Sequence, residues 1–318
     1  MNSLTINFKE DRQVWDTFVS TSPQRSIFVY SRFLDSLQAK YDLVTCYDKD
    51  KIVAGTVIIY TDSGTPIDTP FPFTQYQGVL LADNSTLATH SQLTLELKIV
   101  TDFIAQLTDH FSSYSLSQSW RLRDLRPFQW HNYHEPDKGR FKIDLRYTGV
   151  LDRASYGTFD DYVSSIRKVK RQEFNKSSRQ LTLKMSDDAE LLDHLHAKTF
   201  ARQNIARTPQ ESALIKSIAS HAFTGGYGTM CCALLDDVPV SAVMFLYDDR
   251  TGYYLFGAND PEYRKTFAGT LLLIHMIKEA FDSGLQEIDF VGVNSPDRGD
   301  FKISLNADLR PYFITSID

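Results

Sequence analysis

Apolar and polar positions along the chain follow two spacings, and together they predict a mixture of helices and strands. Apolar residues three and four apart predict helices, and short alternating or continuous apolar runs predict strands. The expected helices cover 13–20, 31–40, 86–111, 159–178, 188–203 and 268–283. The expected strands cover 43–48, 52–60, 76–82, 115–122, 141–147, 181–185, 229–235, 238–247, 252–258, 285–292 and 311–317. The pattern therefore indicates an α/β protein with mixed sheets.

The order of the expected elements repeats once along the chain. Each half contains a hairpin, a strand, a helix, a strand, a connector and a last strand, although the residues themselves do not repeat. The tight hairpin turns fall at 49–51 and at Asp236-Asp237. This repetition predicts two similar domains, residues 1–149 and residues 150–318.

Composition narrows the class of protein. A chain of 318 residues is comfortable for two domains, and 42% apolar with 23% charged residues is typical of a globular protein. A net charge of -6 argues against bulk binding of nucleic acid, which needs an excess of Lys and Arg. No sequence feature predicts an oligomeric state.

Cysteine usage and the first residues indicate where the chain works. Three cysteines without framework spacing suit a reducing compartment, where they serve as small buried apolar residues. The start, MNSLTINFKEDRQ, has no apolar h-region, and the longest apolar stretch, 271–277, is too short to span a bilayer. We therefore expect a cytoplasmic protein without membrane insertion.

The segment FGANDPEYRKTFAGTLLLIHMI, residues 256–277, carries the clearest chemical signal. A strand ends, a polar loop follows, and a helix opens at Ala268, Gly269 and Thr270, whose small side chains allow a ligand to approach the backbone. The free N–H groups of a helix start and its dipole attract anions, and Arg264 and Lys265 add positive charge. We expect a pyrophosphate here; the alternative is an ordinary strand–loop–helix with a convenient glycine.

The corresponding loop of the first half, LLADNSTLATHSQ, has different chemistry. It contains Asp83 and has no glycine, lysine or arginine, so it would repel a phosphate. We therefore expect the second domain to bind a phosphorylated carrier and the first domain to help bind the acceptor.

The loop of the second half resembles the carrier-binding element of the GNAT superfamily of acyl-CoA-dependent acyltransferases. The superfamily pattern is Q/R-x-x-G-x-G/A, and its three marked positions are Arg264, Phe267 and Gly269 in this chain. Phe267 thus replaces the first glycine of the pattern.

Further segments resemble the FemAB-like branch of that superfamily, which has two tandem GNAT-like domains. The last of these segments carries Asp289, Gly292, Phe301 and Lys302, while Leu305-Asn306 departs from the Phe-Gly usual in the family. The segments, in chain order, are RSIFVYSRFL (25–34), DLRPFQW (124–130), IRKVKRQEFNKSSR (166–179) and EIDFVGVNSPDRGDFKISLNADLRPYF (287–313).

The resemblance implies an N-acyltransferase that uses acyl-CoA and needs no metal. In overall likeness the chain resembles enzymes that acylate nucleotide-linked amino sugars, such as dTDP-3-amino-3,6-dideoxyhexoses, for surface polysaccharides such as O-antigen. The alternatives are a FemX-like transferase that passes an aminoacyl group from tRNA to a peptidoglycan precursor, and a binding protein without catalysis. The absent helical arm and the acidic charge count against the tRNA-dependent transferase, whereas Phe267 favours the binding protein.

The resemblance also assigns the carrier site. The pantetheine arm would lie along the strand 252–258, where a backbone N–H stabilises the oxyanion, and the pyrophosphate would lie on 266–270. The expected carrier-binding residues are Phe256, Gly257, Ala258, Arg264, Lys265, Thr266, Phe267, Ala268, Gly269 and Thr270.

Two residues are expected to act in the chemistry. Asp289 would serve as the base or orient the amine, and its alternative is a structural carboxylate at a strand end. Lys302 would meet developing negative charge or a substrate phosphate, and its alternative is a surface lysine.

Other basic and aromatic residues would bind the acceptor, through its diphosphate, base or sugar. The alternatives are a solvated helix face for the basic residues and core packing for the aromatic ones. The candidates are Arg126, Trp130, Tyr133, Arg167, Lys170, Arg171, Arg202 and Gln203. The histidine pairs His194-x-His196 and His131-x-x-His134 lack further ligands nearby, so we expect no metal site.

Overall fold

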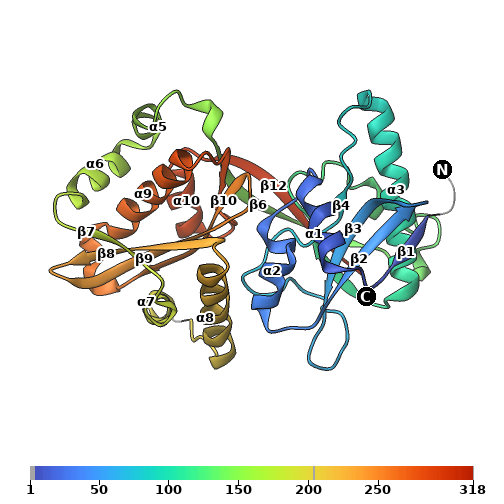
Figure 1. Cartoon of the computed structure of the whole chain (residues 1–318), viewed down its shortest axis with the longest axis horizontal. Helices are drawn as coiled ribbons and strands as arrows, with labels where there is room; N and C mark the ends of the chain where they lie inside the picture. The colour runs from blue at the N-terminus through green and yellow to red at the C-terminus, as the bar shows by residue number, and fades with distance from the viewer. Residues whose placement is uncertain (1–3, 203–204, 318) are drawn as a thin grey trace. The chain divides into compact units, whose positions relative to one another are not determined.

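The computed structural model describes residues 4–202 and 205–317. The chain forms two compact units (Figure 1). Unit 1 is drawn from Met1–Arg146 and Pro311–Asp318, and unit 2 is Tyr147–Arg310. The last strand of the chain therefore contributes to the first unit. The division into GNAT-like domains at residues 149 and 150 stays a prediction.

Unit 1 contains a four-stranded antiparallel sheet with the order β1-β2-β3-β4. These strands are β1 Thr5–Asn7, β2 Tyr41–Asp48, β3 Lys51–Ile59 and β4 Leu80–Leu81. Separately, β5 (Tyr114–Ser117) pairs antiparallel with β12 (Asp308–Ile317). The helices are α1 Arg12–Thr21, α2 Ser31–Leu34, α3 Thr89–His110 and α4 Arg126–Trp130, with short 3-10 turns η1 Ile27–Val29, η2 Asp35–Leu37 and η3 Pro136–Lys138. The buried stripe of α3 packs into the core of this unit.

Unit 2 is built on a mixed sheet with the order β6-β11-β10-β9-β8-β7. Its strands are β6 Lys142–Asp152, which begins in unit 1, β7 Thr182–Ser186, β8 Gly228–Leu235, β9 Val238–Tyr247, β10 Thr251–Asn259 and β11 Glu287–Asp289. Its helices are α5 Phe159–Ser165, α6 Lys168–Ser177, α7 Ala189–Ala201, α8 Pro209–Thr224, α9 Ala268–Asp282 and α10 Pro296–Ile303, with 3-10 turns η4 Arg153–Ser155 and η5 Pro261–Thr266. Only the pair β10–β11 is parallel among the pairs described within this unit.

Helices cover both faces of the sheet of unit 2. Figure 1 shows α6 and α9 on one side and α7 and α8 on the other. Phe256 of β10 meets the ring of His196 on α7, whereas Tyr254 of the same strand joins the core around α9. Ten residues of α9 are buried, which agrees with a helix that is apolar nearly all round. The start of α9 is consequently fixed against the sheet.

The expected helix 159–178 is in fact two helices, α5 and α6, separated at Ile166 and Arg167. Ile166 is extended and buried, so its apolar side chain reaches the core instead of continuing the helical stripe. The guanidinium of Arg171 donates to the carbonyl oxygens of Ser164 and Ile166, which satisfies acceptors that the break leaves without a helical donor. The break therefore follows from tertiary packing rather than from a proline or glycine.

Three helices of the structure, α4, α8 and α10, were not expected from the pattern. The start of α8 carries clear signals, because Thr208 and Glu211 form a capping box and Pro209 occupies the first turn. The expected strands 76–82, 115–122 and 285–292 shorten to Leu80–Leu81, Tyr114–Ser117 and Glu287–Asp289. The fold class, an α/β protein with mixed sheets, is confirmed.

We predict that Ile274→Ala in α9 lowers the free energy of unfolding by about 2–5 kcal/mol, because it leaves a cavity in the core of unit 2. Ile205→Ala removes the same atoms from a side chain that is 44% exposed and should cost under about 0.5 kcal/mol. Urea unfolding measures both variants. Equal losses would show that α9 does not form the core described here.

Candidate active site

The strands β10 and β11 part in the middle of the sheet. Their parallel pairing ends at Tyr253 and Asp289, and a bulge follows in β10 between Tyr254 and Phe256. Beyond Asp289 the chain stays with β6, where the N–H of Phe290 donates to Gly149. Among the described residues, no strand therefore pairs with the edge of β10 that faced β11. Such an edge offers backbone groups to an extended ligand.

The segment that follows β11, residues 290–292, turns sharply away from β10 and is held by Lys302 of α10. Val291 and Gly292 both have positive φ, 52° and 88°. The ammonium of Lys302 donates to the carbonyl oxygens of Phe290 at 2.5 Å and Gly292 at 2.9 Å. It also lies 5.1 Å from the ring centre of Tyr254. Lys302 thus links the two sides of the opening between the strands.

The charge on Lys302 is sensitive to pH near neutrality. Burial lowers the pKa of its ammonium to about 7, and the positive charge of Arg298 acts in the same direction while Asp289 opposes it. A lysine in such an environment exists in both charge states at neutral pH. A buried lysine with a pKa near neutrality is typical of sites where negative charge develops on a ligand.

Asp289 is buried at the last pair of β10 and β11. Its carboxylate accepts hydrogen bonds from the hydroxyl of Thr148 at 2.6 Å and from the N–H of Val291 at 2.7 Å. The same hydroxyl accepts from the N–H of Gly292 at 3.1 Å. These contacts fix the turn whose carbonyl groups bind Lys302. The role of Asp289 as a base stays a prediction.

The end of β10 meets the start of α9. A side-chain carbon on Gly269 would lie 2.8 Å from the amide oxygen of Asn259, so any larger residue would have to displace that side chain. The hydroxyl of Thr199 on α7 bonds to both the N–H and the carbonyl of Asn259. Phe256, Gly257 and Ala258 therefore lie on a strand end whose position is fixed next to the first turn of α9.

Phe267 precedes α9 in the left-handed conformation, with φ 56° and ψ 29°. Glycine adopts this conformation without strain, which explains why the superfamily pattern has glycine there. For another residue the conformation costs on the order of 1–3 kcal/mol. Here Ser177 of α6 donates to the carbonyl of Thr266, and the ammonium of Lys176 lies 5.2 Å from the ring centre of Phe267.

The first turn of α9 combines basic groups with one acidic neighbour. The hydroxyl of Thr270 donates to Glu173 of α6, and the ammonium of Lys170 pairs with the same carboxylate at 2.8 Å. Lys170 therefore lies beside the start of α9 rather than being a solvated residue. Arg264 and Lys265 are exposed on η5, and neither has a carboxylate partner among the described residues. They remain available to an anionic ligand.

Two of the other basic candidates of unit 2, Arg167 and Arg171, have partners within the protein. The guanidinium of Arg167 forms two hydrogen bonds with Asp300, each 3.0 Å long. Arg171 holds the break between α5 and α6. Arg202 is exposed at the carboxyl end of α7. Gln203 lies outside the described residues.

In unit 1, the candidates Arg126, Trp130 and Tyr133 form an exposed aromatic and basic surface. Trp130 is 51% exposed and Tyr133 is 58% exposed. The guanidinium of Arg126 lies 5.3 Å from the ring centre of Trp130 and pairs with Asp124. A second guanidinium, that of Arg140, lies 5.2 Å from the ring centre of Tyr133. These rings are not core residues, so the alternative of core packing is wrong for both.

His196 is a buried residue that sequence reasoning treated only as a poor metal ligand. Burial, with the charge of Arg207 acting in the same direction, lowers the pKa of its imidazole to about 4. Arg207 hydrogen-bonds both to Nδ1 of His196 at 2.9 Å and to Asp193. The neutral ring stacks on Phe200 and contacts the ring of Phe256 on β10. The signal in the sequence that could have identified this residue was a histidine on the apolar side of a predicted helix.

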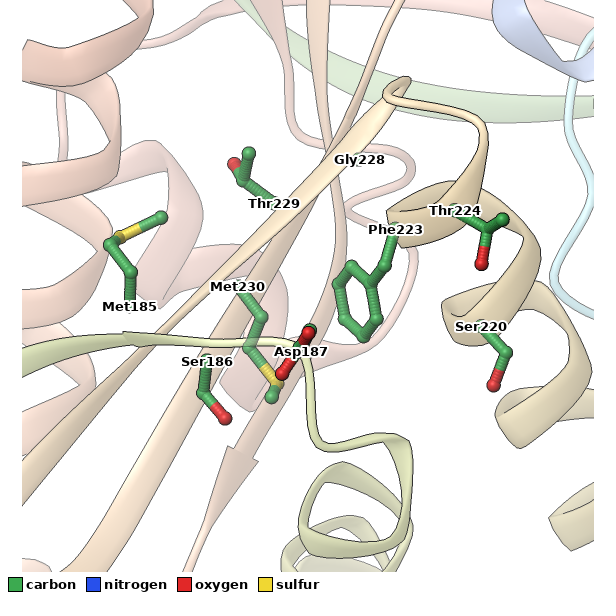
Figure 2. A pocket seen from close by; sticks show the side chains of 9 residues that line it. All are labelled: Met185, Ser186, Asp187, Ser220, Phe223, Thr224, Gly228, Thr229 and Met230. Atoms are coloured by element: carbon green, nitrogen blue, oxygen red, sulfur yellow. The ribbon is translucent and has the colours of Figure 1, made fainter.

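A separate hollow of about 650 Å³ lies elsewhere on unit 2, between β7, β8 and the end of α8 (Figure 2). None of the candidate site residues lines it. Its lining residues are Met185, Ser186, Asp187, Ser220, Phe223, Thr224, Gly228, Thr229 and Met230. The opening between β10 and β11 is thus a different feature.

Two further properties bear on the class of protein. In the part of the chain that the structure describes, no group of three or more His, Cys, Asp or Glu is arranged to hold a metal ion. Among the helices of residues 4–202 and 205–317, none has both the length and the apolar character needed to cross a membrane.

Comparison with known proteins identifies the domain. Residues 164–302 match the family described as acetyltransferase (GNAT) domain. This match includes β10, the start of α9 and Lys302, so the parted strands described above lie within the matched region. The chain is an acyltransferase, and a GNAT domain implies acyl-CoA as co-substrate. No curated protein matches the chain in sequence.

Solved structures share the fold over the whole chain. The crystal structure of FemX has a TM-score of 0.67 at 12% identity and covers 97% of this chain and 96% of its own. A tandem GNAT protein from the clavulanic acid biosynthesis pathway has a TM-score of 0.54 at 9% identity and covers 99% and 98%. L-PGS from Bacillus licheniformis has a TM-score of 0.54 at 10% identity and covers 98% and 93%. The tandem GNAT architecture expected from the sequence is therefore confirmed.

We predict that the stability of the wild-type protein rises as the pH is raised from about 7 towards 10. Because the pKa of Lys302 is lowered from its ordinary 10.5 to about 7, the unfolded state binds more protons in this window. Lys302→Met should remove this rise, as measured by urea unfolding at several pH values. Lys184→Met makes the same change at an exposed strand position and should leave the rise intact. An unchanged pH dependence in Lys302→Met would contradict the buried lysine.

Proposed function

We propose that the protein transfers an acyl group from acyl-CoA to the amine of a nucleotide-linked amino sugar, with the carrier bound in unit 2. The observation that carries the proposal is the parting of β10 from β11 beside the amino-terminal start of α9. An extended pantetheine arm fits along the unpaired edge of β10, and its pyrophosphate fits the first turn of α9. Arg264 and Lys265 would supply the opposite charge.

The chemistry requires one nucleophilic attack and one departure. The amine nitrogen attacks the thioester carbon, the carbon–sulfur bond breaks, and coenzyme A leaves as a thiolate. The proton lost by the amine passes to a base, for which Asp289 is the proposed residue, or to an ordered water. A backbone N–H of β10 near Gly257 would stabilise the oxyanion of the tetrahedral intermediate. Lys302, in its charged form, would stabilise the same negative charge.

The narrower substrate, a dTDP-3-amino-3,6-dideoxyhexose, rests on the overall likeness of the sequence to enzymes of that kind. The exposed rings of Trp130 and Tyr133 in unit 1 support an acceptor that carries a base or sugar ring, because aromatic faces stack on both. The adjacent guanidinium of Arg126 would attract a diphosphate. The same substrate class would connect the enzyme to surface polysaccharides such as O-antigen, with the reaction in the cytoplasm.

The second candidate function is a FemX-like transfer of an aminoacyl group from tRNA. FemX shares the fold over nearly the whole of both chains, which favours keeping this candidate. The acidic net charge of -6 counts against a tRNA substrate, since counterion release needs many basic contacts. The two candidates differ in their donor, so donor binding separates them.

Calorimetric titration with coenzyme A tests the carrier site. We predict that the wild type binds coenzyme A and that Arg264→Ala/Lys265→Ala weakens binding about 5- to 30-fold, equivalent to about 1–2 kcal/mol. The control, Lys216→Ala/Lys278→Ala, removes two partly exposed, ion-paired charges elsewhere on unit 2 and should bind as the wild type does. Equal weakening in both variants would mean that only net charge matters and that η5 does not contact the carrier.

A thiol-release assay then distinguishes the acceptors. Acetyl-CoA with a dTDP-linked 3-amino sugar should release coenzyme A faster than acetyl-CoA with the same sugar lacking the nucleotide. Transfer from aminoacyl-tRNA without coenzyme A binding would instead establish the second candidate. Absence of binding to either donor would leave a protein that kept the fold without catalysis.

A further inference from the structure

Tyr254 occupies the point where β10 leaves β11. It is the first residue of β10 beyond the last pair, Tyr253 with Asp289, and it directly precedes the bulge. Its ring packs against Phe245 and Phe290 and lies above the ammonium of Lys302. Only 9% of the residue is exposed. The ring is therefore held firmly at the base of the opening between the strands.

The hydroxyl of Tyr254 lies beside Gly257 on the carrier strand. A side-chain carbon at Gly257 would lie 1.9 Å from the tyrosine oxygen, so no other residue could occupy this position without moving the ring. The bulge brings Tyr254 and Gly257 to the same face of β10, although regular alternation would place them on opposite faces. Glycine thus leaves the hydroxyl uncovered at the strand segment proposed to bind the pantetheine arm.

This hydroxyl has no hydrogen-bond partner within the described parts of the chain, 4–202 and 205–317. Neighbouring tyrosines differ in this respect. The hydroxyl of Tyr253 donates to Asp248 at 2.6 Å, and that of Tyr247 lies 2.7 Å from the hydroxyl of Thr229. The hydroxyl oxygen of Tyr254 is not among the fully buried side-chain atoms that lack a partner, so it keeps some exposure to solvent. A partly accessible hydroxyl that bonds to no described residue and lies beside Gly257 is available to a ligand bound along β10.

The protonation state determines what this hydroxyl can do. Burial raises the pKa of Tyr254 to about 12, so the group keeps its proton throughout the physiological range. It can therefore donate a hydrogen bond but cannot serve as a base. The acceptors available along a bound acyl-pantetheine are its amide carbonyls and its thioester carbonyl.

We propose that the Tyr254 hydroxyl donates a hydrogen bond to the thioester carbonyl oxygen of the bound acyl-CoA, and so assists the acyl transfer as a catalytic residue. This assignment rests on the proposed function. The reacting carbonyl belongs where the strands part, since the acceptor amine must reach it, and Tyr254 is the side chain of β10 at that point. The hydrogen bond strengthens as negative charge develops on the oxygen in the transition state. No proton is transferred by this residue.

The test compares two ligands on the full-length protein by calorimetry. One is coenzyme A, which lacks the carbonyl, and the other is the analogue of acetyl-CoA in which a methylene replaces the sulfur, which keeps the carbonyl but cannot transfer its acyl group. Tyr254→Phe should weaken binding of the analogue about 3- to 10-fold, as expected for one lost hydrogen bond, and leave binding of coenzyme A unchanged. With a 13C label in the analogue, the carbonyl resonance of the complex should move upfield in the variant.

The control is Tyr247→Phe, which removes a partly buried hydroxyl from the adjacent strand β9. It should lower the melting temperature, because Thr229 loses its partner, yet bind both ligands as the wild type does. Melting temperatures of both variants also establish that each is folded.

The outcomes separate this assignment from the proposed function. Selective loss for the analogue, with the change in carbonyl resonance, supports the role of Tyr254. If Tyr254→Phe affects the two ligands equally, or neither, the assignment is overturned while the carrier site stands. If the wild type binds neither ligand, the proposed function fails and this assignment fails with it.

Discussion

The parting of β10 from β11 is the constraint on which the site depends. The two parallel strands have no hydrogen bonds to each other beyond Tyr253 and Asp289. The sheet tolerates this because other groups bind the two separated segments. The departing chain keeps its bonds to β6, and Lys302 binds two of its carbonyl groups. On the other side, Thr199 and Gly269 fix the end of β10 against α7 and α9. The opening is therefore a stable part of the fold.

Strain and buried charge are concentrated around this opening. Phe267 adopts a left-handed conformation that glycine would adopt without cost, and Val291 does so on the opposite side. Lys302 places an ammonium where burial opposes its charge. Each of these costs free energy in the fold, and the large core around α9 offsets them. Such a distribution is typical of sites that bind or transform a ligand.

The elements that depend on local sequence patterns were the ones predicted correctly. The hairpin of β8 and β9 and the start of α9 were correct because apolar periodicity and turn residues specify them within a few positions. The bulge after Tyr254, the break at Ile166 and the two carbonyl bonds of Lys302 could not be predicted, since each depends on neighbours distant in sequence. The likeness to GNAT enzymes directed attention to Lys302 but not to Tyr254. That residue becomes noticeable only when the bulge places it beside Gly257.

The return of β12 to unit 1 has a consequence for how the chain matures on the ribosome. Unit 2 lies wholly within Tyr147–Arg310 and can complete its sheet once those residues have emerged. Unit 1 starts first, yet β5 gains its neighbour β12, and Gln118 gains its bond to Thr315, only after synthesis reaches the residues near 317. Domains usually fold in the order of their synthesis. Here the earlier part of the chain finishes last, and until then its apolar strand edge is a natural substrate for chaperones.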